Sequence, residues 1–180
     1  MLIGSYHNSP GLKNNDWITP PEIIKALGPF DLDPCSPKDR PWDTAKKHYT
    51  IIDNGLWMPW ENRVWLNPPY GANTARWLEL MAAHGNGTVL TFARTETKMF
   101  FQYVWPLADS ILFLKGRLNF YYIDGTRAPK NAGAPSVLIA YGAENTIALE
   151  ASGIAGKLIR LKQPAPVRKS ILGKYFRCKR

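Results

Sequence analysis

The segment Asn67-Pro68-Pro69-Tyr70 combines residue types that can hold a planar amino group. The side-chain oxygen of Asn67 and the carbonyl oxygen of Pro68 can each accept one hydrogen of an exocyclic –NH₂ group. The ring of Tyr70 can stack on the heterocycle that carries this group. Because acceptors hold both hydrogens, the nitrogen lone pair becomes more available to an electrophile. The segment therefore predicts group transfer to an amino nitrogen, with a methyl donor beside it.

The residues before this segment predict that it lies at the edge of a sheet. Val64–Leu66 is typical of the end of a buried strand, and the two prolines that follow remove backbone donors and fix φ, so the chain must leave the sheet there. A structural alternative remains, because Asn and Pro are also common turn residues and Tyr70 could simply cap the core.

The sequence resembles the amino-methyltransferases, in which an Asn-Pro-Pro-Tyr tetrad is catalytic. Together with Trp17-Ile18-Thr19-Pro20 and Phe30-Asp31-Leu32-Asp33-Pro34, the segment Val64 to Gly71 is similar to the small phage-type DNA N6-adenine methyltransferases. The similarity runs from about Asp16 to Gly142. It implies S-adenosylmethionine as the cofactor, adenine N6 in double-stranded DNA as the acceptor, a target base rotated out of the duplex, and no metal. It also implies catalytic roles for Asn67, Pro68, Pro69 and Tyr70.

Two upstream segments are the candidates for cofactor binding. In the resembling family the Trp-x-Thr-Pro segment lines the cofactor site, while as structure Thr19 caps a helix that runs from Pro20 to a stop at Gly28-Pro29. Acidic side chains at the end of a parallel strand suit a ligand with hydroxyl and cationic groups. Asp53 could bond the cofactor, or could belong only to an Asp-Asn-Gly turn. The predicted cofactor-binding residues are Trp17, Thr19, Pro20, Asp31, Asp33, Pro34 and Asp53.

One feature departs from the common methyltransferase pattern. The glycine-rich turn that usually follows the first strand is missing, and Pro34-Cys35-Ser36-Pro37 stands in its place. Cys35 is interpreted as a small buried residue near the cofactor and not as a nucleophile.

Candidate DNA contacts lie later in the chain. Arg94 follows a predicted strand on the same edge as Asn67, and could bind phosphate or hold its loop through Glu96. The others lie in a region that surrounds the target base in the family, for which a mobile surface loop is the alternative, and in the basic tail. The predicted DNA-binding residues are Arg94, Arg117, Phe120, Arg127, Lys130, Arg168 and Lys169.

The pattern of elements predicts a compact, Rossmann-like α/β methyltransferase domain, with a mostly parallel sheet and helices on both faces. Strands are expected over 30–34, 64–66, 88–93, 111–114, 118–122 and 136–141, with a helix over 73–83 and an abbreviated sheet between Asp33 and Asn67. The predicted domain covers residues 16–156, preceded by a flexible arm, 1–15, and followed by a basic tail, 157–180.

Charge is concentrated in this tail. The chain has 180 residues, 45% of them hydrophobic, and a net charge of +9. Nine basic and no acidic residues lie in 157–180, so the preceding residues are formally neutral. Such a segment favours a polyanion, or is merely a solvated end. The two cysteines suggest neither a disulfide nor a zinc site, and a cytoplasmic protein with no signal peptide, membrane span or membrane partner is expected.

Other functions remain open at this stage. The same tetrad can hold an adenine in RNA or a glutamine amide in a protein, and the tail does not separate DNA from RNA. A catalytically silent nucleic-acid-binding module is a further alternative, which would bind DNA without binding a cofactor. The sequence does not predict the oligomeric state or the recognised DNA sequence.

Overall fold

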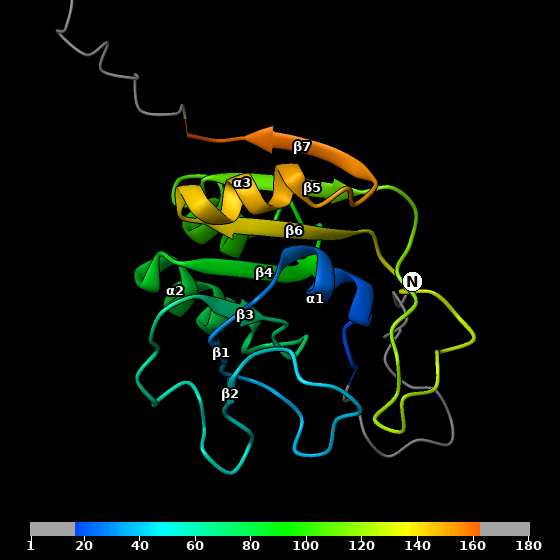
Figure 1. Cartoon of the computed structure of the whole chain (residues 1–180). Coiled ribbons are helices and arrows are strands. Elements are labelled where there is room, and N and C mark those ends of the chain that lie inside the picture. The colour runs from blue at the N-terminus through cyan, green and yellow to red at the C-terminus, as the bar shows by residue number, and fades with distance from the viewer. Residues whose placement is uncertain (1–16, 163–180) are drawn as a thin grey trace, which may run out of the picture.

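The computed structural model describes residues 17–162, and its seven strands form one sheet in the order β2-β1-β3-β4-β6-β5-β7 (Figure 1). The strands are β1 (Leu32–Asp33), β2 (Lys47–His48), β3 (Val64–Leu66), β4 (Gly87–Phe92), β5 (Ser110–Leu114), β6 (Ser136–Tyr141) and β7 (Gly156–Arg160). The predicted α/β class is therefore confirmed.

Half of the sheet is parallel. β1 pairs with β2 and β3, and β3 pairs with β4, all in the same direction. Helix α2 (Thr74–His84) connects β3 to β4, which confirms the predicted strand-helix-strand crossover. Gly85 ends this helix in the left-handed conformation, with φ of 73°. The carboxyl ends of these strands meet at one edge, which brings the segments after β1 and β3 together.

The other half is antiparallel, so the prediction of a mostly parallel sheet is wrong. β6 runs antiparallel to both β4 and β5, and β7 runs antiparallel to β5. The connection from β5 to β6 contains no helix, whereas parallel neighbours need a long crossover. Every residue of β6 is buried, as is typical of parallel strands, so its composition does not reveal the reversal.

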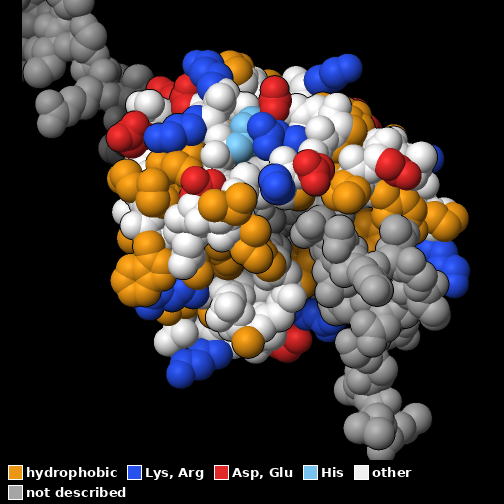
Figure 2. Space-filling view, turned by 90° about the horizontal axis from the view of Figure 1, so that it is seen from below, with side chains coloured by type: hydrophobic (Ala, Val, Ile, Leu, Met, Phe, Trp, Pro, Cys, Tyr) orange, Lys and Arg blue, Asp and Glu red, His pale blue; other side chains and the backbone are white. Residues whose placement is uncertain are grey.

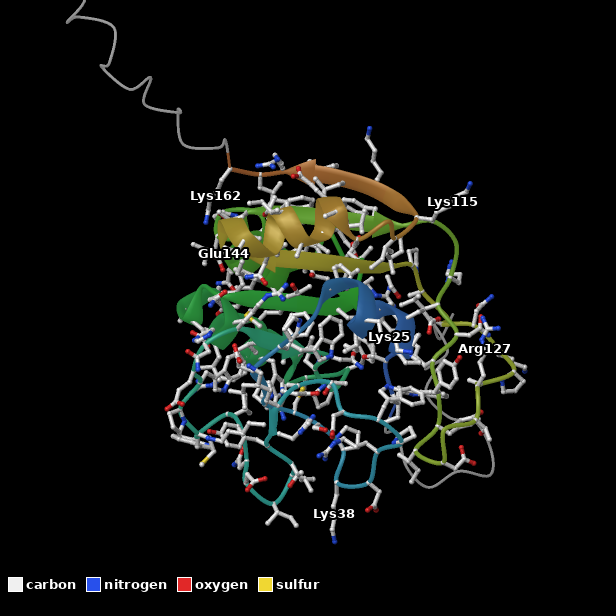
Figure 3. The ribbon with its side chains drawn as sticks, viewed as in Figure 1. Lys25, Lys38, Lys115, Arg127, Glu144 and Lys162 are labelled. Atoms are coloured by element: carbon white, nitrogen blue, oxygen red, sulfur yellow. The ribbon has the colours of Figure 1, made fainter. Side chains whose placement is uncertain are left out.

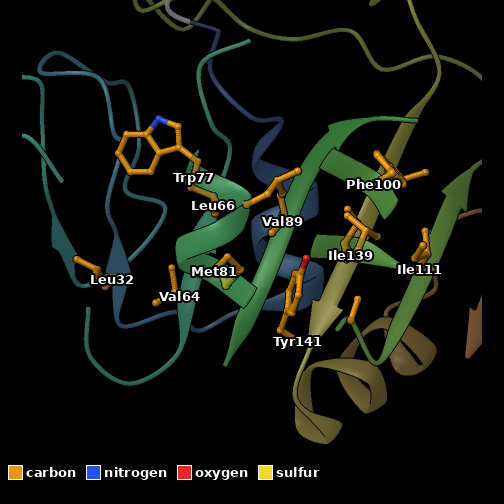
Figure 4. Packing of buried hydrophobic residues seen from close by; sticks show 14 of the residues in the cluster. Leu32, Val64, Leu66, Trp77, Met81, Val89, Phe100, Ile111, Ile139 and Tyr141 are labelled. Carbon is orange, nitrogen blue, oxygen red and sulfur yellow. The ribbon is translucent and has the colours of Figure 1, made fainter. Parts of the chain in front are cut away.

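Helices cover both faces of the sheet. On one face, α2 and the short π-helix η1 (Phe100–Val104) pack against a cluster that includes Leu66, Val89 and Ile139 (Figure 4). On the other, α1 (Pro21–Leu27) and α3 (Ala143–Ala151) pack against a second cluster around Trp65 and Leu138. Burying a side chain of this size contributes roughly 1.5–3 kcal/mol. The strand ends that carry the candidate site are therefore fixed from both sides.

Helix α1 begins one residue later than predicted. Its N-cap residue is Pro20 and its first helical residue is Pro21, with no side-chain hydrogen bond to the cap. Thr19 therefore does not cap the helix. The predicted end is correct, because the helix stops at Leu27 and Gly28 donates to the carbonyl of Ile24.

The predicted strand over 118–122 does not form. Residues 115–135 make a long loop with two isolated bridges, one between Tyr121 and Ile18 and one between Tyr121 and Arg127. Apolar spacing predicted a strand here, but no neighbouring strand is available beyond these single bridges. The Ile18 bridge ties the loop to the segment before α1.

The sheet continues into the segment predicted as a basic tail. β7 pairs with β5 from Ser110↔Arg160 to Leu114↔Gly156, so residues as far as Arg160 belong to the fold. The remainder of the tail and the arm before Trp17 lie outside the described residues.

The loop between β2 and β3 exposes large hydrophobic side chains, with Ile51 at 92% exposure beside Ile52 and Trp57. Figure 2 views the molecule from this side and shows hydrophobic patches between charged groups. In the part of the chain that the structure describes, no helix has the length and apolar character needed to cross a bilayer.

Candidate active site

A cleft of about 600 Å³, counted to its open mouth, lies where β1 and β3 end. It brings together seven of the predicted site residues, namely Trp17, Thr19, Asp33, Asn67, Pro68, Pro69 and Tyr70. Eight residues outside the predicted set complete its lining, namely Ile18, Cys35, Ser36, Pro37, Arg40, Trp42, Thr44 and Trp65. The tetrad and the segments 17–19 and 33–44 therefore share one cavity.

The side chain of Asn67 is held at its nitrogen and open at its oxygen. Nδ2 donates to the carbonyl of Trp17 at 3.2 Å and to Oγ1 of Thr19 at 3.3 Å. Because a carbonyl can only accept, the Trp17 contact fixes the orientation of the amide. Oδ1 is buried and has no hydrogen-bond partner among the described residues. A buried acceptor without a donor costs roughly 1–3 kcal/mol, so this atom is suited to a donor from a ligand.

Thr74, the first residue of α2, holds the turn that the tetrad forms. Oγ1 of Thr74 donates to the carbonyl of Pro69 at 2.8 Å and accepts from the backbone N–H of Gly71 at 3.0 Å. Pro68 is buried and Pro69 is exposed. Thr74 was not among the predicted residues, although a hydroxyl residue shortly after a Pro-Pro turn is an available signal for such a contact.

The ring of Tyr70 lies parallel to that of Phe92. Their centroids are 4.2 Å apart and the rings are inclined by only 9°. Tyr70 is half-buried, and burial raises the pKa of its phenol, which stays neutral. Phe92 ends β4 and was not predicted as a site residue, because nothing local in its sequence distinguishes it from core.

Asp33 is a buried carboxyl group, 4% exposed. Oδ1 accepts from the backbone N–H of Cys35 at 3.1 Å, and Oδ2 accepts from Oγ1 of Thr44 at 2.5 Å. Burial raises its pKa to about 6, against the lowering effects of the two hydrogen bonds and of nearby Arg40. At neutral pH Asp33 is a carboxylate that its surroundings compensate only in part.

The β1 and β3 turns are linked directly. Sγ of Cys35 donates to the carbonyl of Asn67 at 3.2 Å, and burial raises the pKa of the thiol well above its ordinary value. Cys35 is therefore a neutral packing group beside the cleft, as interpreted from the sequence.

Four predicted cofactor residues do not line the cleft. Asp31 bonds Lys46 at 2.8 Å and the N–H of Arg63 at 3.1 Å, and Lys46 lowers its pKa. Asp53 accepts from the N–H and hydroxyl of Thr50, at 2.7 and 2.9 Å, within its own turn. Pro20 caps α1, and the Pro34 backbone packs against Gly55.

The predicted DNA contacts are mostly exposed. Arg94, Arg127 and Lys130 are exposed, and among the described residues none of them forms an ion pair. Arg117 is also exposed, and donates to the carbonyl of Ala132 at 3.2 Å. Figure 3 shows Arg127 extending outward from the 115–135 loop.

The remaining predicted contacts differ from these. Phe120 is only 5% exposed and packs 6.3 Å from the ring of Trp17, so it supports the wall of the cleft. Arg168 and Lys169 lie outside the described residues.

The 115–135 loop is joined to the cleft by aromatic contacts. Trp42 donates from Nε1 to the carbonyl of Thr19 at 3.1 Å, and its ring meets Tyr121 edge-on at 5.1 Å. Trp17 packs against Tyr122 at 5.4 Å. The loop that carries Arg117 and Arg127 is therefore anchored on two residues that line the cleft.

The family model for DNA N-6-adenine-methyltransferase (Dam) matches residues 7–148. This chain belongs to the Dam family. The match confirms the resemblance to phage-type adenine methyltransferases, and supports methylation of adenine N6 in DNA as the general reaction. No curated protein and no solved structure matches the chain significantly.

The Dam-family match includes every residue that lines the cleft and the whole 115–135 loop, and ends before β7. No cluster of three or more potential metal ligands occurs within residues 17–162.

Proposed function

We propose that this Dam-family chain transfers the methyl group of S-adenosylmethionine to N6 of adenine in double-stranded DNA, with the target base held by the tetrad. The observation that carries the proposal is the buried, unpartnered Oδ1 of Asn67. Its position matches the need for an acceptor facing an amino hydrogen. We also propose that the domain is of the Rossmann-like type, because its ligand cleft lies at the carboxyl edge of parallel strands between covering helices.

The proposed hold on the amino group uses two acceptors. Oδ1 of Asn67 takes one hydrogen and the carbonyl of Pro68 takes the other. The contacts of Nδ2 with Trp17 and Thr19 keep Oδ1 from rotating away. Tyr70 stacks on the adenine ring, and Phe92 keeps Tyr70 in its plane. This positioning restricts the base to a reactive orientation.

The residue types that line the cleft match the chemical groups of S-adenosylmethionine. This cofactor carries a cationic centre, an ammonium, a carboxylate, ribose hydroxyls and an adenine ring, and when bound it supplies an electrophilic methyl group. Asp33 offers a buried carboxylate, Thr19 and Ser36 offer hydroxyls, and Trp17 and Trp42 offer aromatic surface. No strong base is needed, because the methylated nitrogen is cationic and its proton can pass to Asn67 Oδ1 or to solvent.

A base stacked in a duplex cannot reach this cleft, so we propose that the target adenine is rotated out, at a cost of a few kcal/mol. Exposed Arg117, Arg127 and Lys130 lie on the loop anchored to the cleft, where they can bind phosphates on either side of the rotated base.

The test is direct. The purified chain is incubated with methyl-labelled cofactor and unmethylated duplex DNA, RNA or a protein fraction in parallel, and the products are digested and identified by mass spectrometry. We expect N6-methyladenine from DNA. Label only in RNA adenine or in glutamine, or tight DNA binding with no cofactor binding, would contradict the proposal.

A further inference from the structure

The described lining of the cleft contains one acidic and one basic side chain, Asp33 and Arg40. Arg40 lies in the loop between β1 and β2, and its side chain is only 25% exposed. Nε donates to Asp43 at 2.9 Å, and Nη1 lies 3.5 Å from the carbonyl of Pro37. Asp43 thus holds the guanidinium from the side, and among the described residues no acceptor bonds Nη2.

The amino-acid part of S-adenosylmethionine carries both charges, an ammonium and a carboxylate. Asp33 supplies a partner for the ammonium. A carboxylate needs a cation or several N–H donors, because leaving it unpaired in a partly buried site is costly.

The start of α1 is the other candidate for the carboxylate, and its chemistry argues against it. Pro20 and Pro21 have no N–H, and the N–H of Ile23 already bonds the carbonyl of Pro20 at 3.0 Å. The helix has only seven residues, so its dipole is small. This terminus therefore lacks the set of free donors that binds anions at other helix starts.

We propose that Arg40 binds the carboxylate of the methionine part of S-adenosylmethionine, while Asp33 in the same cleft pairs with the ammonium. This inference rests on the proposed function above. The outer edge of a guanidinium presents parallel N–H donors that match the two oxygens of a carboxylate. With Nε held by Asp43 and one N–H of Nη1 directed to the Pro37 carbonyl, the other N–H of Nη1 and both of Nη2 remain for the ligand.

The experiment compares two cofactor analogues by isothermal titration calorimetry on the full chain. S-adenosylhomocysteine has the amino-acid end, and 5′-deoxy-5′-methylthioadenosine lacks it. Arg40→Met should weaken binding of the first by roughly 10- to 100-fold, the range for loss of a charge-assisted pair, and should change binding of the second less than about twofold. Lys38→Met is the matched control, because it removes the same charge from the same loop, and the Lys38 side chain points into solvent (Figure 3). This substitution should change the affinity for neither analogue.

Two further measurements keep the result interpretable. Thermal unfolding of each variant reports whether it folds, and if Arg40→Met does not, Arg40→Lys together with the methyl ester of S-adenosylhomocysteine replaces it. The ester should bind wild type at least tenfold more weakly than the acid, and Arg40→Lys should narrow this preference because an ammonium lacks the planar fork.

The outcomes separate the two proposals. Equal weakening of both analogues in Arg40→Met, no weakening of either, or an effect on DNA affinity alone would overturn the role of Arg40. Failure of wild type to bind either analogue would instead overturn the proposed function.

Discussion

The side-chain nitrogen of Asn67 donates to the backbone carbonyl of Trp17 at 3.2 Å, across 50 residues of sequence. This hydrogen bond joins the tetrad to the segment before α1, and it leaves Oδ1 of the same amide as a buried acceptor. One side chain thus connects the two halves of the cleft through its nitrogen while its oxygen remains without a partner among the described residues.

Replacing Tyr70 should separate ring stacking from the phenol group. Tyr70→Ala should lower kcat/KM by at least tenfold, because it removes the ring on which we propose that the base stacks. Tyr70→Phe keeps the ring and should retain most activity. Equal loss in both variants would contradict the stacking role.

Phe92 should affect the reaction through Tyr70. Phe92→Leu keeps an apolar side chain but removes the 4.2 Å ring stack, worth roughly 0.5–1.5 kcal/mol, and should lower kcat by about 3- to 10-fold. Phe92→Tyr keeps an aromatic ring at this position and should retain the wild-type kcat. Affinity for S-adenosylhomocysteine should not change in either variant; a parallel loss of cofactor affinity would indicate general damage to the cleft.

The charged carboxylate of Asp33 should lower the stability of the fold at neutral pH and raise its affinity for the cofactor. Its pKa is about 6 in the fold, against 3.8 for the ordinary carboxyl, so the protonated form is favoured by folding. This stabilisation is complete below about pH 4 and is lost as the pH rises through about 6. Asp33→Asn should therefore raise the free energy of unfolding at pH 7 by roughly 1–3 kcal/mol, measured in urea, while cofactor affinity falls.

Asp53→Asn is the matched control for that experiment. The hydrogen bonds from Thr50 lower the pKa of Asp53, so its contribution to stability is present at neutral pH and is lost as the pH falls through the folded value. The two variants should thus shift stability at pH 7 in opposite directions. A gain in both would contradict the assignment of buried charge to Asp33.

The loop after β2 should depend on Gly55. A Cβ at Gly55 would meet the backbone oxygen of Pro34 at 1.9 Å, next to Asp33. Gly55→Ala should therefore displace the loop or the Asp33 turn and lower both melting temperature and cofactor affinity. Gly153→Ala is the control, because nothing lies within 4 Å of its Cβ position, although its φ of 69° still imposes some strain.

Removal of the basic tail should weaken DNA binding. The domain should stay folded only if the truncation begins after Lys162. β7 pairs along β5, so a cut at Lys157 would remove a strand of the sheet. Deleting residues 163–180 removes six of the nine basic residues of the tail. The slope of log K against log salt should fall by about 0.9 for each lost phosphate contact. An unchanged slope would show that the tail does not bind phosphate.

Local sequence chemistry was sufficient to predict much of this architecture. The prolines after Leu66, the glycines after Leu27 and His84, and the buried strand runs mark element ends through backbone constraints that act over a few residues. The cavity around Asn67 could be predicted because carboxyl ends of parallel strands share an edge.

Features that depend on distant contacts could not be predicted in this way. Arg40, Trp42 and Thr44 lie in a polar loop without periodicity, and only the fold brings them to the cleft. The antiparallel half escaped prediction because a strand that is buried on both faces has the same apolar sequence pattern whether it runs parallel or antiparallel to its neighbours. Thr19 was predicted to cap a helix and to bind the cofactor, but its hydrogen bond with the side chain of Asn67 escaped prediction because the distance between the two residues is not visible in the sequence.

The most direct test of the central claim is Asn67→Ala, measured for both methylation and cofactor binding. Loss of the Asn67 oxygen, which we propose accepts a hydrogen of the amino group, should reduce N6-methyladenine formation by at least 100-fold. Affinity for S-adenosylhomocysteine should stay within about threefold, because Asp33 and Arg40 are untouched. Turnover comparable to wild type in this variant would contradict the account.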